Sequence, residues 1–344
     1  MTTFVYGAGR MGREALAHCR MQGIEPQAFI DRTARSGMTL DGIPVLSPEV
    51  ASLEGVGADV LVALHSPGID VAGVIDALRA ERYANVDTLW NESVRSGWLP
   101  RSPFWLDPKF DWSTEDDAIA RARQLLVDDA SRTVFDQQIA LRRNGDYAKL
   151  STPTPDDQYM PRGLEAWRRP MRLLDCGAYD GDTIRALRAA GNIIESYLAL
   201  EPDPANFARL VESLGSDSTG QLLQVGAYSV QGQLSFNSGE GGAAHVDAGG
   251  ATTIEVVRID DLCSDFAPTL IKMDIEGAER QALQGAMQTI SRDRPDLAIS
   301  TYHRLDDLWR IALQIDILQP GYRFHLRSHA YNGFDTVLYA VMPR

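Results

Sequence analysis

Leu173-Leu-Asp-Cys-Gly-Ala-Tyr-Asp-Gly-Asp-Thr183 is the segment that decides the fold of this 344-residue chain. A short apolar run enters a turn that contains two glycines, and a helical pattern follows the turn. A strand, a glycine turn and a helix in this order begin a parallel α/β unit. In such units the ligand crevice lies outside the carboxyl ends of the strands. The segment therefore predicts a Rossmann-like domain with a binding site at this turn.

The charges of the turn indicate which ligand it would accept. Asp175, Asp180 and Asp182 accompany the glycines, and the turn contains no cation. Carboxylates would repel a pyrophosphate but stabilise the ammonium and sulfonium groups of S-adenosylmethionine. Gly177 and Gly181 would let the main chain pass close to that ligand. We therefore predict S-adenosylmethionine as the cofactor, held by the residues Asp175, Gly177, Ala178, Tyr179, Asp180, Gly181, Asp182 and Thr183. For Asp182, capping of the helix is the alternative interpretation.

Polar residues at the ends of later strands extend the predicted site. Glu201 follows the strand Tyr197–Leu200, where its carboxylate could accept hydrogen bonds from both ribose hydroxyls. Gly226 and Ala227 follow another short strand and are expected to border the adenine. The apolar runs 269–273 and 297–301 place Asp274, Tyr302 and His303 at the same edge of the sheet.

A second glycine turn lies near the N-terminus and has the opposite charge. Gly7, Gly9 and Gly12 follow a strand and open a helix, and Asp31 ends the next strand. This pattern is typical of a dinucleotide site, with Asp31 on a ribose. It would equally allow close packing of a strand and a helix. The sequence leaves both interpretations open. If the turn is a binding site, its ligand would be a nucleotide or nucleotide-sugar.

The order of these patterns predicts two α/β domains and a connector. We expect a small Rossmann-like domain at residues 1–100, a linker and helical arm at 101–168, and the cofactor domain at 169–344. The arm is helical in pattern over residues 114–143.

Composition excludes several kinds of protein. Lys+Arg 33 against Asp+Glu 47 gives a formal net charge of −14, which disfavours nucleic acid and anionic membranes as partners. Cys19, Cys176 and Cys263 show neither disulfide nor zinc-ligand spacing. The sequence shows no signal peptide and no apolar run of membrane-spanning length. We therefore expect a cytoplasmic protein, for which a homo-oligomer is compatible with the sequence.

The C-terminal half resembles the FkbM-type methyltransferase family. The resemblance is carried by Leu174-Asp-Cys-Gly-Ala-Tyr-Asp-Gly181, Leu200-Glu-Pro-Asp203, Arg258-Ile-Asp-Asp-Leu262 and above all Leu270-Ile-Lys-Met-Asp-Ile-Glu-Gly-Ala-Glu279. It implies an α/β fold with a mostly parallel seven-stranded sheet and an antiparallel final strand. It also implies transfer of a methyl group to an oxygen, commonly a sugar or polyketide hydroxyl. By the same likeness, Tyr159 would cap the cofactor and Pro202 would lie beside it.

Methyl transfer to a hydroxyl needs alignment of the acceptor and removal of its proton. His303 is the predicted general base, and Asp274 is the alternative. Asp274 could instead hold the cofactor's ammonium group or, with Glu276 or Glu279, ligate a divalent metal ion. Tyr302, Arg327 and His329 are predicted to contact the acceptor, although a solvated loop is the simpler interpretation for the last two.

Two rival functions use the N-terminal glycine turn. The chain could be an NAD-dependent oxidoreductase or a non-catalytic nucleotide-binding protein. The acidic turn at Asp175 argues against the first of these.

Overall fold

The segment at Leu173 forms strand β7 (Met171–Cys176), a tight turn and helix α7 (Asp182–Ala189). Both glycines of the turn have left-handed backbone, with φ +77° at Gly177 and +86° at Gly181. A Cβ atom added to Gly177 would lie 1.9 Å from the carbonyl oxygen of Asp274. The glycine therefore lets the ends of β7 and of the neighbouring strand approach each other.

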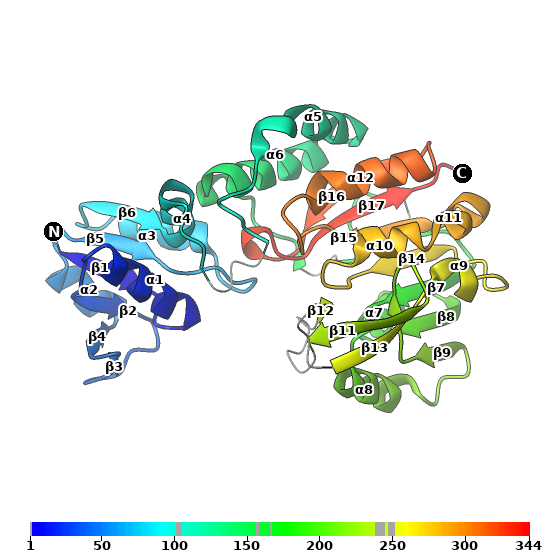
Figure 1. Ribbon diagram of the computed structural model, residues 1–344, viewed down its shortest axis with the longest axis horizontal. Coiled ribbons are helices and arrows are strands. Elements are labelled where there is room, and N and C mark those ends of the chain that lie inside the picture. The colour runs from blue at the N-terminus through cyan, green and yellow to red at the C-terminus, as the bar shows by residue number, and fades with distance from the viewer. Residues whose placement is uncertain (1, 101–104, 156–157, 166, 238–244, 247–251) are drawn as a thin grey trace. The chain divides into compact units, whose positions relative to one another are not determined.

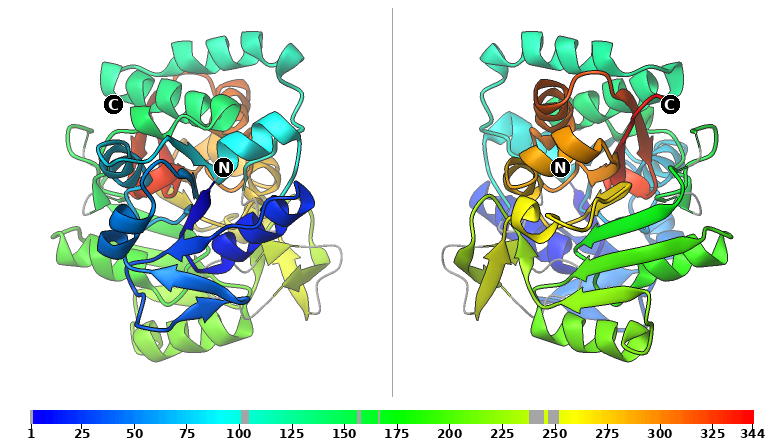
Figure 2. Two further views of the ribbon diagram at one scale, coloured as in Figure 1. Left: turned by 90° about the vertical axis from the view of Figure 1, so that its left-hand side faces the viewer. Right: turned by 90° about the vertical axis from the view of Figure 1, so that its right-hand side faces the viewer.

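Seven strands form the C-terminal sheet, in the order β16-β17-β15-β14-β7-β8-β9. Strand β17 is antiparallel to both of its neighbours, and the pairs from β15 to β9 are parallel. This arrangement confirms the predicted sheet with its antiparallel last strand. The green strands of this sheet lie side by side in the right-hand view of Figure 2. Besides β7, the strands of this sheet are β8 (Ile194–Leu200), β9 (Gly220–Leu223), β14 (Leu270–Met273), β15 (Asp296–Ser300), β16 (Arg323–Ser328) and β17 (Thr336–Val341).

Helices α7 and α8 (Pro204–Leu214) bury Ile184, Leu187, Leu210 and Leu214 in one hydrophobic core with strand residues such as Tyr197. Helix α8 begins where the sequence predicts. Asp203 accepts hydrogen bonds from Ala205 and Asn206 N–H at 2.9 Å, and Pro204 follows it at the first helical position. Four further helices complete the domain (Figure 1): α9 (Ile259–Leu262), α10 (Glu279–Gln284), α11 (Met287–Asp293) and α12 (Asp307–Leu318).

A small second sheet adjoins the C-terminal domain, in the order β10-β13-β11-β12. The sequence analysis does not predict it, because its strands are short and only Ala227, Ile254 and Val256 among their described residues are buried hydrophobics. Its strands are β10 (Gly226–Ala227), β11 (Gly232–Asn237), β12 (His245–Val246) and β13 (Thr252–Val257).

The predicted helical arm consists of two helices, α5 (Asp116–Leu125) and α6 (Asp129–Asn144). The break falls where Leu126 bridges Phe324 of β16 and where Val127 N–H donates to the Phe324 carbonyl at 3.0 Å. Asp128 then accepts from Ser131 N–H at 2.8 Å and caps the second helix. Pairing with the edge of the sheet thus interrupts a continuous helical pattern.

The N-terminal unit contains a six-stranded sheet in the order β3-β4-β2-β1-β5-β6, which is parallel except for the β3–β4 pair. This is the smaller Rossmann-like domain that the sequence predicts. Its elements are β1 (Thr3–Tyr6), α1 (Arg10–Met21), β2 (Ala28–Ile30), β3 (Thr39–Leu40), β4 (Ile43–Leu46), α2 (Pro48–Glu54), β5 (Asp59–Val62), α3 (Val71–Arg79), β6 (Asn85–Thr88) and α4 (Leu89–Ser96).

The computed structural model describes residues 2–100, 105–155, 158–165, 167–237, 245–246 and 252–344. By its contacts the chain divides into two units. One comprises residues 1–112, 133–153 and 330–334, and the other comprises residues 113–132, 154–329 and 335–344. The domain boundary predicted at residue 101 falls outside the described residues. Among the helices that the structure describes, none is long and apolar enough to cross a membrane.

Candidate active site

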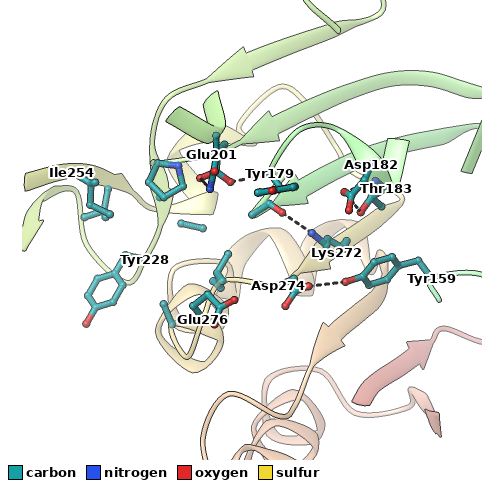
Figure 3. A pocket seen from close by; sticks show the side chains of 18 of the residues that line it. Tyr159, Tyr179, Asp182, Thr183, Glu201, Tyr228, Ile254, Lys272, Asp274 and Glu276 are labelled. Atoms are coloured by element: carbon teal, nitrogen blue, oxygen red, sulfur yellow. Dashed lines mark hydrogen bonds between the residues drawn. The ribbon is translucent and has the colours of Figure 1, made fainter. Parts of the chain in front are cut away.

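A cavity of about 410 Å³ lies at the turn after β7, within the C-terminal unit (Figure 3). Its volume is in the range of small-molecule sites. Ile254 and Tyr228 lie at one end of it, and Tyr159, Lys272 and Asp274 lie at the other. The cavity lining brings together ten of the predicted cofactor residues: Tyr159, Gly177, Tyr179, Asp182, Thr183, Glu201, Pro202, Gly226, Ala227 and Asp274.

Asp175 is buried behind the turn, where it contacts Lys272, and it does not line the cavity. Its side chain is fully buried, and Lys272 Nζ lies 3.1 Å from its Oδ1. The same ammonium group donates to the Gly177 carbonyl at 2.7 Å. Burial raises the pKa of Asp175 to about 6, although Lys272 opposes the shift. Burial alone would lower the pKa of Lys272, but the charges of Asp175 and Asp274 raise it. The pair therefore fixes the glycine turn by a buried ionic contact.

Glu201 organises the opposite side of the turn. One carboxylate oxygen accepts from Tyr179 N–H at 2.9 Å, and the other accepts from Asp203 N–H at 2.9 Å. Burial raises the pKa of Glu201, against these hydrogen bonds. Asn206 Nδ2 also donates to Oε1 at 3.4 Å, but Oε2 has a further lone pair and can still accept from a hydroxyl in the cavity.

Asp274 ends strand β14 and is contacted from several elements. Tyr159 Oη donates to its Oδ2 at 3.0 Å, and Tyr302 Oη lies 3.5 Å from its Oδ1. Burial would raise the pKa of Asp274, but His303 and Lys272 hold it below the ordinary value. Asp274 is therefore an anion at neutral pH at one end of the cavity.

His303 lies behind Asp274 and does not line the cavity. Its Nδ1 is 2.8 Å from Glu279 Oε1, and its Nε2 is 3.3 Å from Asp274 Oδ1 and 3.5 Å from Glu276 Oε2. Burial would lower the pKa of His303, but the carboxylates of Glu279, Glu276 and Asp274 raise it to about 10. An imidazolium has no lone pair with which to accept a proton. To act as a general base, His303 would first have to lose this proton, and its role as base stays a prediction.

Strained backbone gathers at the cavity. Of the seven described residues other than glycine that have positive φ, four line it: Tyr159, Tyr179, Glu276 and Asp335. Each such residue costs about 1–3 kcal/mol and persists only where its surroundings fix it. Strain of this kind is typical of binding and catalytic sites.

The cavity lining is strongly acidic. Among its described residues, Asp182, Glu201, Asp274, Glu276 and Asp335 carry carboxyl groups, and Lys272 alone carries an amine. Burial raises the pKa of Glu276 to about 8 and that of Asp335 to about 6, with neighbouring carboxylates adding to both shifts. The excess of carboxylates favours a ligand with positive charge.

Several predicted site residues lie elsewhere. Ala178 and Gly181 shape the turn without reaching the cavity lining, and Asp180 forms an ion pair with Arg185 at 2.8 Å. Arg327 contacts Asp128 at 3.3 Å and Ser131 at 2.7 Å. His329 is buried between the Thr154 carbonyl and Tyr339 Oη, 2.8 Å from each. The last two side chains thus have partners in the fold, whereas Tyr302 lines the cavity as expected.

Some residues of the cavity lining escape the sequence analysis. Ile254 and Val256 come from the unpredicted small sheet, and Asp335 comes from the turn before β17. Asn206 follows the Asp203 cap on α8 and also lines the cavity. The pairing of Lys272 with a buried carboxylate could be inferred from its place on an apolar strand.

At the N-terminal glycine turn, Asp31 Oδ2 accepts from Ala8 N–H at 2.8 Å, and its other oxygen accepts from Thr33. A Cβ at Gly12 would lie 2.1 Å from the Gly7 carbonyl oxygen, whereas one at Gly9 would meet nothing within 4 Å. Gly12 is therefore required by helix–strand packing. Part of the turn's hydrogen-bonding capacity is already used by Asp31.

Comparisons with known proteins agree with this geometry. Residues 175–326 match the family model described as Methyltransferase FkbM domain. The 2-O-methyltransferase NoeI of Sinorhizobium fredii (strain NBRC 101917 / NGR234) is 28% identical over 149 residues, which are 36% of this chain and 60% of that protein. The matched segment thus spans less than two thirds of NoeI. The crystal structure of Methyltransferase FkbM from Methylobacillus flagellatus KT has 25% sequence identity and a TM-score of 0.76, and the match covers 99% of this chain and 90% of that one.

The sheet with its antiparallel last strand, the glycine turn after β7 and the carboxylate after β8 define an S-adenosylmethionine-dependent methyltransferase domain. Within that class, residues 175–326 form an FkbM methyltransferase domain.

Proposed function

We propose that this chain transfers a methyl group from S-adenosylmethionine to a hydroxyl oxygen of a sugar-containing acceptor. The observation that carries the proposal is the cavity itself. A glycine turn, a ribose-compatible carboxylate at Glu201 and an apolar end at Ile254 occur together with an excess of carboxylates. The sugar is suggested by NoeI, whose name describes 2-O-methyl transfer.

In this proposal the cofactor lies along the cavity shown in Figure 3. Its adenine contacts Gly226, Ala227 and Ile254, and its ribose hydroxyls donate to Glu201. Its sulfonium and ammonium groups lie toward Asp274, where carboxylates stabilise positive charge. Transfer cancels the sulfonium charge and is an in-line displacement, so alignment of the acceptor behind the methyl carbon is the main catalytic requirement.

The acceptor would enter beside Tyr302, Glu276 and Asp335, which line the cavity. These side chains offer hydroxyl and carboxyl groups that can hydrogen-bond several hydroxyls of one sugar. With Arg327 and His329 engaged by other residues, the acidic lining disfavours an anionic acceptor such as a nucleotide-sugar. We therefore favour a neutral or amine-bearing saccharide.

Calorimetry on the full chain tests the cofactor. We expect S-adenosylmethionine and S-adenosylhomocysteine to bind and NAD to give no heat of binding. Binding of NAD without either adenosyl compound would instead support the oxidoreductase alternative. Methyl transfer is then measured with a labelled methyl donor and a panel of neutral, amine-bearing and nucleotide-linked sugars. Preferential methylation of the nucleotide-linked sugars would contradict the proposed acceptor class.

A further inference from the structure

His303, Asp274, Glu276 and Glu279 form a carboxylate–histidine cluster at one wall of the cavity. Three carboxyl groups surround one imidazole, so even a protonated imidazole leaves an excess of negative charge when all three are ionised. His303 and Glu279 are almost completely buried, with side chains 4% and 0% exposed. Asp274 and Glu276 are partly exposed and line the cavity. The cluster therefore consists of two buried side chains, His303 and Glu279, and two carboxylates that line the cavity.

The buried nitrogen of His303 faces this opening. Among the described residues Nε2 has no hydrogen-bond partner, although it is inaccessible to solvent. Its neighbours are Asp274 Oδ1 at 3.3 Å and Glu276 Oε2 at 3.5 Å. These separations are longer than those of a good charge-assisted hydrogen bond, which are about 2.7–2.9 Å. The 3.3 Å separation matches instead two donor atoms on one cation, because bonds of about 2.1 Å at octahedral or tetrahedral angles separate donors by about 3.0–3.4 Å. The 3.5 Å separation to Glu276 lies just outside this range.

The other ring nitrogen is oriented as in a metal site. Nδ1 lies 2.8 Å from Glu279 Oε1, and that oxygen also accepts from Ile275 N–H at 2.9 Å. A histidine that binds a metal through one nitrogen usually donates its other N–H to a carboxylate, which fixes the ring and its tautomer. Ligand atoms of Asp274, Glu279 and His303 all lie within 4.8 Å of one another.

We propose that this cluster binds one divalent cation, with His303 Nε2 and Asp274 as ligands, Glu276 completing the protein donors and Glu279 orienting the imidazole. The donor set of two carboxylates and one imidazole suits a hard cation such as Mn²⁺, whose remaining positions would be open to water or acceptor. The inference rests on the proposed methyl transfer. The cation takes the place of the proton on Nε2, so that His303 binds it as a neutral imidazole whose remaining N–H donates to Glu279.

The cation gives the acceptor hydroxyl a place to bind beside the cofactor. A hydroxyl bound to a divalent ion loses its proton to water more readily than a free one. The resulting oxygen attacks the methyl carbon, and the electron pair of the broken carbon–sulfur bond remains on sulfur as S-adenosylhomocysteine. No oxidant or reductant is required, and the released proton passes to solvent.

Manganese binding by the chelator-treated full chain tests the proposal without an acceptor. We expect one Mn²⁺ per chain by electron paramagnetic resonance and calorimetry. The substitutions His303→Gln and Asp274→Asn should abolish it, and Glu279→Gln should weaken it roughly 10–100-fold. The matched control is His325→Gln, which changes a histidine that lies 2.5 Å from a single carboxylate, Asp128, and should leave Mn²⁺ binding intact.

Three results would overturn the site: no Mn²⁺ binding by the wild type, unchanged binding in His303→Gln, or equal loss in the control. In the first case the cluster is a buried ion-pair group only. Glu276→Gln, at a side chain 24% exposed, provides a second variant if His303→Gln does not fold. S-adenosylhomocysteine binding is measured in parallel. If it persists while Mn²⁺ binding is absent, the cation proposal fails and the methyltransferase proposal stands. If it is absent from the wild type, the proposed function itself fails.

Discussion

Replacement of Gly177 by alanine should damage both the fold and the cofactor site. The residue has φ +77°, and its new Cβ would lie 1.9 Å from the Asp274 carbonyl oxygen. A left-handed backbone costs about 1–2 kcal/mol for a residue with a Cβ. Displacing a packed main-chain group adds about 1–3 kcal/mol. We therefore expect Gly177→Ala to lower the free energy of unfolding by about 2–5 kcal/mol.

Gly191 supplies a matched control in the same domain. It has φ +83°, but a Cβ there would meet nothing within 4 Å. Gly191→Ala should therefore show only the backbone term of about 1–2 kcal/mol. The difference between the two variants in urea unfolding isolates the steric contact with Asp274.

Calorimetry with S-adenosylhomocysteine then connects the contact to function. Because the turn must move away from β14, Gly177→Ala should lose at least about 1.4 kcal/mol of binding free energy, a tenfold weakening. Gly191→Ala should bind as the wild type does. If both variants lost the same stability and both kept full affinity, the close approach of the two strand ends would not matter to the site.

Three further predictions concern charged groups. Lys272→Met should destabilise the domain by about 3–5 kcal/mol in thermal unfolding, since it leaves Asp175 buried without a cation. Adding Asp175→Asn to this variant should restore stability. A cost below about 1 kcal/mol for Lys272→Met alone would refute the buried pair. Glu201→Gln should weaken S-adenosylhomocysteine binding by about 1.5–3 kcal/mol because a charged acceptor is lost. Glu195→Gln, at an exposed position of the preceding strand β8, should have no effect, and similar losses in both variants would contradict a ribose contact. Burial alone would raise the pKa of Asp128, but hydrogen bonds from Ser131 and His325 outweigh burial, so its pKa lies below the ordinary value. Its stabilisation is therefore present above its unfolded pKa of about 3.9 and lost as the pH falls below it. Urea unfolding from pH 8 to pH 2 should show wild type and Asp128→Asn converging only at the acid end.

The sequence predicts the sheet and the cofactor end of the cavity because both depend on local patterns. A strand, a glycine turn and a carboxylate after the next strand are each readable within a few residues, and the structure places Gly177, Tyr179 and Glu201 around one cavity. The seven-stranded, mostly parallel sheet and its antiparallel last strand follow from the family resemblance, not from periodicity, and the order of the strands is known from the structure alone.

Other parts of the site depend on contacts between distant segments. Asp335 reaches the cavity because β17 inserts between β15 and β16, and spacing alone does not reveal this. The surroundings of His303 are similarly non-local. Its type and position suggest a base, but they do not reveal Glu279 on α10, whose Oε1 lies 2.8 Å from its Nδ1. The arm at Leu126 is interrupted for the same reason, since strand pairing with Phe324 overrides helical propensity.

Tyr159 bears on how the cofactor enters and leaves. Its main-chain N–H donates to Tyr339 Oη at 3.0 Å, its carbonyl accepts from Trp167 Nε1 at 2.7 Å, and its hydroxyl donates to Asp274. Because Tyr159 is hydrogen-bonded to Tyr339, Trp167 and Asp274, it forms a fixed wall of the cavity and does not act as a mobile lid. We therefore expect S-adenosylhomocysteine to associate in one kinetic step, with an observed rate that rises linearly with concentration, because this wall is preorganised before the ligand arrives.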